Sequence, residues 1–150
     1  MNADETTDTD VRLEVYRFFA ERGRPPVPAE VAENLGTVQS VVEASLRRLA
    51  DDHVLVLAPG TPYIWMANPL SALPTPYKVE IAGRAWFGNC IWDALGVVAM
   101  FGGDGTVKTW CPDCGRRLHA EVADNHVVSG HGVVHFAVPA AQWWDDIGFN

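Results

Sequence analysis

The sequence is short of cysteines and basic residues and has no long apolar run, and each shortage excludes a class of protein. Its 150 residues hold 11 lysines and arginines against 19 aspartates and glutamates, a net charge of −8. This balance argues against nucleic-acid binding, because phosphate recognition needs a clustered basic surface. No apolar stretch approaches the ~20 residues of a membrane-crossing helix. We therefore expect neither a membrane nor a nucleic acid as partner.

The three cysteines are too few, and odd in number, for a disulfide framework. The first ten residues, MNADETTDTD, are acidic and polar, the reverse of a secretory signal. We therefore expect a cytoplasmic protein whose thiols are reduced and available for thiol or metal chemistry. The hydrophobic content of 48% is ample for a folded body.

The pattern of residues 1–66 predicts a winged-helix-like domain, because three helices followed by a β-hairpin is the order of that fold. DNA recognition by the third helix would be its functional interpretation. Against this, residues 1–66 hold six arginines and eleven acidic residues, so we interpret the segment as a structural domain. The expected elements are a polar tail over 1–9, helices over 11–21, 28–36 and 37–49, and hairpin strands over 54–57 and 63–66.

The remaining chain predicts a proline-rich linker over 67–76 and a small mixed α/β domain over 77–150, which makes the whole protein α+β. The most apolar stretch, residues 86–100, predicts a buried helix that contains Cys90. Strands are expected over 77–81, 106–110, 118–122 and 133–138, and a last helix or turn over 140–146.

Cys90 and Asp93 carry the clearest chemical signal. At spacing i, i+3 on a helix, a thiol and a carboxyl lie on the same face and can meet one substrate. A thiolate is a soft metal ligand, and a carboxylic acid whose pKa is raised by burial can deliver a proton. The alternative is a buried structural cysteine beside an aspartate that caps a neighbouring turn.

The segment RAWFGNCIWDAL, residues 84–95, resembles the motif of the organomercurial (alkylmercury) lyases, in which a tryptophan-containing run leads into Cys-x-x-Asp. Cys111 falls where that family has another cysteine, and VHFA at 134–137 with Trp143 is similar to a later stretch of the family. The resemblance covers most of residues 11–146, in the right order. It also matches the predicted winged-helix-like front to the family's N-terminal domain.

This resemblance implies a lyase that cleaves a carbon–mercury bond by protonolysis. It implies that Cys90 binds the metal and that Asp93 protonates the departing carbon. The partners would be a small organometallic substrate and low-molecular-weight thiols, and no cofactor would be required beyond those exogenous thiols. The rival interpretations are a non-catalytic protein that binds or senses a soft metal or zinc, and a related enzyme that uses the same pair on a non-mercury substrate.

One position departs from the family. Its second essential cysteine precedes the VHF strand, where this sequence has SGHGV at 129–133 and no cysteine. His131 is the nearest replacement by position, and the Cys-Pro-Asp-Cys segment at 111–114 is the other candidate. The metal ligands expected from the sequence, for bound mercury or zinc, are therefore Cys90, Asp93, Cys111, Cys114 and His131.

The Cys-Pro-Asp-Cys segment has other interpretations as well. One CxxC is half of a four-cysteine zinc site, which Cys90, His119 or His131 could complete. It could also be a redox pair or a structural turn with two reduced thiols. His119 and His135 alternate with apolar residues, so we expect both to be buried core histidines.

Overall fold

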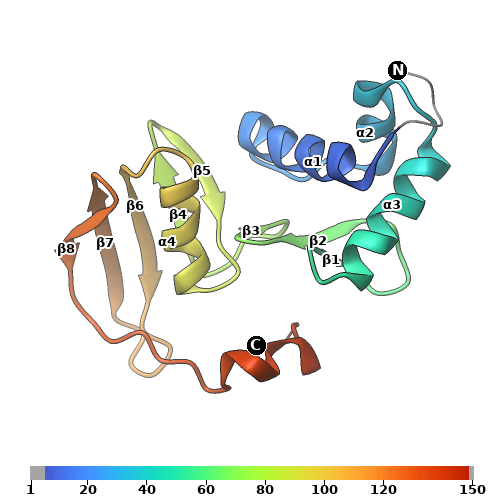
Figure 1. Ribbon diagram of the computed structural model, residues 1–150. Coiled ribbons are helices and arrows are strands. Elements are labelled where there is room, and N and C mark those ends of the chain that lie inside the picture. Colours follow the sequence, from blue (N-terminus) through green and yellow to red (C-terminus); the bar gives the residue numbers. More distant parts are fainter. Residues whose placement is uncertain (1–5, 149–150) are drawn as a thin grey trace.

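In the computed structural model, which describes residues 6–148, the first three elements are the helices α1, α2 and α3 (Figure 1). They span Asp8–Arg22, Pro28–Leu35 and Gln39–Asp51. α1 begins after Thr7, whose hydroxyl accepts the backbone N–H of Asp10 while the Asp10 carboxylate accepts the backbone N–H of Thr7. This reciprocal cap starts the helix three residues earlier than the apolar spacing predicts. The expected tail over 1–9 therefore overlaps α1, and residues 1–5 lie outside the described chain.

A small antiparallel sheet of order β1-β2-β3 follows the helices. Its strands are Val56–Leu57, Ile64–Ala67 and Leu70–Ser71. The β1–β2 pair confirms the predicted hairpin. The segment expected as a linker, 67–76, contributes the end of β2 and all of β3. Ala67 and Leu70 are fully buried there, because their apolar side chains gain more from the core than from an exposed connection.

The second sheet is antiparallel and has the order β5-β4-β6-β7-β8. Helix α4, Ile91–Met100, packs against β4 and β6 on one face (Figure 1). Strand pairing places Val79 beside Val107 on that face, and both are fully buried. Lys78 pairs with Lys108 on the opposite face, as the two-residue period of a strand requires. The strands are Lys78–Ile81, Arg84–Phe87, Gly105–Trp110, Arg117–Ala123 and His126–Gly130.

Two expectations about the second half are wrong. Cys90 does not lie within the buried helix but is its N-cap, because α4 begins at Ile91. The strand predicted over 133–138 is not formed, and Val133 is 92% exposed. An apolar alternation makes a strand only where a neighbouring strand offers hydrogen bonds, and no strand of the described chain pairs with this segment. The last predicted element is confirmed as a 3₁₀ helix, η2, over Ala140–Asp145.

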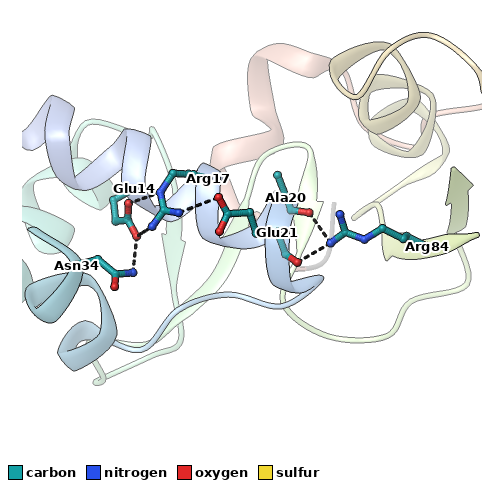
Figure 2. Close-up of polar contacts among 6 residues, drawn as sticks. All are labelled: Glu14, Arg17, Ala20, Glu21, Asn34 and Arg84. Carbon is teal, nitrogen blue, oxygen red and sulfur yellow. Dashed lines mark hydrogen bonds and ion pairs between the residues drawn. The ribbon is translucent and has the colours of Figure 1, made fainter. Parts of the chain in front are cut away.

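The helical half and the second sheet meet where the last turn of α1 contacts β5. The indole N–H of Trp86 donates to the carbonyl of Phe19 at 3.0 Å, and this bond is buried. The guanidinium of Arg84 donates to the carbonyls of Ala20 at 2.7 Å and Glu21 at 2.6 Å (Figure 2). Arg84 therefore provides a donor for two helix-end carbonyls. Trp86 adds a second donor to the Phe19 carbonyl, which also accepts the backbone N–H of Gly23 at 2.9 Å.

A second set of polar contacts in Figure 2 joins α1 to α2. Arg17 forms ion pairs with Glu14 at 2.6 Å and Glu21 at 2.8 Å, and Asn34 donates to Glu14 at 2.6 Å. One apolar cluster runs through both halves, with members from α1 to β6. Among residues 6–148, no helix is long and apolar enough to cross a membrane.

Replacing Trp86 with phenylalanine tests the contact between the two halves. The change keeps most of the buried ring but removes one of the two donors to the Phe19 carbonyl, whose other donor is the backbone N–H of Gly23 at 2.9 Å. We expect the free energy of unfolding in urea to fall by about 0.5–1.5 kcal/mol, the net contribution of one hydrogen bond. Trp92→Phe is the matched control, because Trp92 is 64% exposed, and it should change stability by less than about 0.5 kcal/mol. Equal losses in the two variants would contradict the assignment.

Candidate active site

Cys90 lies at the junction between β5 and α4. Its backbone is extended, and its sulfur accepts the backbone N–H of Asp93 at 3.4 Å, as an N-cap side chain does. Its carbonyl accepts the N–H of Ala94 at 2.9 Å, which starts the helix. Gly88 makes the tight approach possible, because a Cβ there would lie 2.5 Å from the nitrogen of Ala94. The local backbone therefore presents the thiol at the first turn of α4.

The carboxyl of Asp93 lies beside this thiol, and both groups are half-buried. Burial raises the pKa of Asp93, against hydrogen bonds from Asn89 and from Cys90 that lower it. Burial also raises the pKa of Cys90, and the charge of Asp93 adds to that rise while the backbone N–H opposes it. A thiol in this position can donate to the carboxylate of Asp93, so the two groups can share one proton.

A chain of hydrogen bonds connects this pair to α1. The amide of Asn89 donates to the side-chain oxygen of Asn68 at 3.0 Å. The hydroxyl of Tyr16, on α1, donates to the backbone carbonyl of Asn68 at 2.7 Å. Burial raises the pKa of Tyr16, and the charge of Asp93 is a smaller contribution to the rise. The helical half therefore forms part of the surroundings of Asp93.

The thiol and carboxyl open onto a cavity of about 500 Å³, a size that suits a small organic ligand. Much of its wall comes from the C-terminal segment, which contributes Phe136, Trp143 and Trp144. The ring of Trp144 stacks on His53, just beyond α3, with centroids 4.1 Å apart and planes 6° apart. The other lining residues are Met66, Asn68, Tyr77, Asn89, Trp92, Ile147 and Gly148. The arrangement places a thiol and an acid at the wall of an aromatic cavity.

The structure does not assemble the five metal ligands expected from the sequence. Cys90 and Asp93 are brought together. Cys111 and Cys114 lie in the turn between β6 and β7, and His131 lines a separate cavity of about 230 Å³. Within residues 6–148, no group of three or more histidine, cysteine, aspartate or glutamate side chains is placed to hold a metal ion.

The two histidines expected in the core are exposed instead. His135 borders a cavity of about 180 Å³ that Cys90 also borders, a position that sequence spacing did not indicate. Its placement follows from the missing strand, since residues 131–138 are free to run past the start of α4. Tyr16, Asn68 and Asn89 were also missed. The spacing of Tyr16 places it on the apolar face of a helix, and nothing in that pattern indicates that its hydroxyl makes a hydrogen bond near the site.

Comparison with known proteins gives one family and one fold. The alkylmercury lyase family, MerB, matches residues 70–149, just over half of the chain. Among the solved structures that match is the mercury-bound form of MerB2, with a TM-score of 0.64 and 17% identity. That alignment covers 83% of this chain and 61% of the MerB2 chain, so this chain spans less than two thirds of that protein. At this identity the likeness is one of fold, and the coarser prediction of an α+β fold is confirmed. No curated protein sequence matches.

The shared proton predicts how Cys90 reacts with iodoacetamide, which modifies the thiolate. In a Cys111→Ser, Cys114→Ser background, the midpoint of the alkylation rate against pH should lie above the usual cysteine pKa, because burial and the charge of Asp93 raise it. Asp93→Asn removes the charge, so the midpoint should fall. Glu121→Gln, an exposed substitution on β7, should leave it in place. An unchanged midpoint in Asp93→Asn would argue against the thiol–carboxylate pair.

Proposed function

Because the chain belongs to the alkylmercury lyase family, we propose that it cleaves carbon–mercury bonds by protonolysis, with Cys90 binding the metal and Asp93 donating the proton. The observation that carries the proposal is the pair itself: a thiol and a carboxyl side by side at the wall of an aromatic cavity. Both residues fall within the part of the chain that matches the family. Mercury enters this reaction as part of the substrate.

In the first step the sulfur of Cys90 attacks the mercury of an organomercurial R–Hg–X. The thiol proton passes to the carboxylate of Asp93, a sulfur–mercury bond forms, and X leaves as an anion. The raised pKa of Cys90 means that the thiol is protonated at neutral pH, so the attack needs a base in contact with it. Asp93 is that base.

In the second step the carboxylic acid of Asp93 protonates the carbon bound to mercury. The electron pair of the carbon–mercury bond forms the new C–H bond, the hydrocarbon leaves, and mercury(II) stays on Cys90. The burial that raises the pKa of Asp93 helps this acid to hold its proton until the carbon accepts it. The resulting carboxylate lies next to the metal cation and offsets its charge.

Product release follows from ligand exchange with small thiols. Two exogenous thiolates bind mercury(II), the bond to Cys90 breaks, and a solvent proton restores the Cys90–Asp93 pair. The second sulfur therefore comes from solution, which agrees with the absence of a cysteine at residues 129–133. A reducing cytoplasm would keep Cys90 reduced and supply these thiols.

We propose that the front segment is winged-helix-like and that its role is structural. The three helices and the β1–β2 hairpin follow the order of that fold. The hydroxyl of Tyr16 reaches the Asn68 carbonyl beside the candidate site, which supports a role in holding Asp93 in place. The excess of acidic residues in this segment supports the absence of a nucleic-acid partner.

The activity test uses the purified chain, phenylmercury and excess small thiol, with benzene release measured by gas chromatography. The unchanged chain should release benzene, and Cys90→Ala should reduce release to the uncatalysed rate. Asp93→Asn lacks both the base of the first step and the acid of the second, so it should release benzene roughly 10²–10⁴-fold more slowly, the usual contribution of a positioned acid or base. Glu121→Gln is the control and should keep the full rate. Benzene release by Cys90→Ala at the unchanged rate would exclude this nucleophile.

The pH dependence of kcat/KM follows from the two raised pKa values. Below the pKa of Asp93 the carboxyl keeps its own proton and cannot accept that of the thiol; above the pKa of Cys90 the pair has lost the shared proton. We expect a bell-shaped profile. The midpoint of its acid limb should lie above about pH 3.9 and that of its basic limb above about pH 8.5, the ordinary pKa values of the two side chains. A flat profile across this range would contradict the shared-proton mechanism.

A further inference from the structure

The Cys-Pro-Asp-Cys turn, residues 111–114, has a closely specified backbone. β6 ends and β7 begins at the pair Trp110 and Arg117. The N–H of Cys111 donates to the carbonyl of Arg116 at 2.8 Å, which extends the ladder by one bond. The N–H of Gly115 donates back to the carbonyl of Cys111 at 2.8 Å, and Gly115 has φ +69°, a conformation that side chains rarely adopt. Hydrogen bonds at both ends therefore hold the two cysteines in place.

The same turn points N–H and S–H groups toward the sulfur of Cys111. The backbone N–H groups of Cys114 and Asp113 and the thiol of Cys114 face the sulfur of Cys111 and lower its pKa. Both cysteines are free rather than joined in a disulfide. Two free thiols in one turn, whose backbone is fixed by the bonds of Cys111 to Arg116 and of Gly115 to Cys111, are arranged as a chelating pair for a metal that prefers thiolates.

We propose that Cys111 and Cys114 form a metal site of their own, separate from Cys90, that binds one soft d¹⁰ ion between two thiolates. The ligand class follows from the count of donors. Zinc takes four ligands, whereas mercury(II) and copper(I) are satisfied by two sulfurs. Within the described chain no third histidine, cysteine or carboxylate joins the pair, so a two-coordinate ion fits and a single-chain zinc site does not.

The position of the turn suits exchange with solution. Cys114 is exposed and Cys111 is half-buried, so an ion can reach both sulfurs from solvent. α4 runs into β6 through the turn at residues 101–104 and the chain reverses there. The end of β6 therefore returns to the end of the sheet where α4 and Cys90 begin (Figure 1). The site uses none of the groups of the lyase mechanism, so the inference goes beyond the proposed function and does not rest on it.

The test adds mercury(II) chloride to the Cys90→Ala chain under anaerobic conditions with glutathione present. Metal per chain is measured after gel filtration, and the protected cysteines are identified by iodoacetamide labelling and mass spectrometry. We expect one mercury per chain, with Cys111 and Cys114 both protected, and loss of that mercury when both are changed to serine. The labelling also resolves the three cysteines of the unchanged chain, so the result does not depend on how any variant folds.

A matched control keeps the number of thiols and changes only their spacing. Asp113→Cys with Cys114→Ser, again in the Cys90→Ala chain, leaves two cysteines without the chelating turn. Since the native turn already holds its two thiols in place and the shifted pair must rearrange to chelate, the native spacing should bind mercury at least roughly tenfold more tightly. Equal retention by the two spacings would overturn the proposal. So would zinc chloride alone giving one retained zinc per two chains, because the pair would then be half of a four-thiolate bridge.

Discussion

The buried bond between the Trp86 indole and the Phe19 carbonyl sets how the two halves of the protein meet. Trp86 lies on β5, and only three residues, 87–89, separate it from Cys90. Phe19 lies one turn after Tyr16 on α1, so the same contact that holds α1 on β5 also brings the Tyr16 hydroxyl to Asn68. The thiol and the polar groups behind Asp93 therefore come from elements whose relative position depends on this junction and on the contacts of β3 with β5 and α4.

The sequence predicts the local parts of this arrangement well. Apolar spacing locates the three helices and the hairpin, because each periodicity reports a face that must be buried. The Cys90–Asp93 spacing correctly places a thiol beside a carboxyl, although the reason differs from the expected one. An N-cap side chain points toward the third residue of its helix, so the contact arises at the cap and not on a buried helical face.

The parts that the sequence did not predict depend on long-range pairing. Residues 133–138 have the alternation of a strand, but a strand also needs an edge with which to pair, and local pattern carries no information on that. For the same reason, His119 and His135 were wrongly predicted to lie in the core, and His131 was wrongly grouped with Cys90. The Tyr16–Asn68 bond joins residues 52 positions apart, and neither residue type at its position predicts the other.

Residues 131–138 form no strand, and this affects how the cavity can change during evolution. Its outer wall is held by the ring contact of Phe136 with Trp143, the stacking of Trp144 on His53 and the indole bond of Trp143 to the Val138 carbonyl. The sheet and α4, which position the thiol and the acid, are built from other residues. Substitutions in the wall can therefore alter which organic groups the cavity accepts while the framework of the reactive pair keeps its stability. Changes to this outer wall and changes to the folding core therefore fall on different segments of the chain.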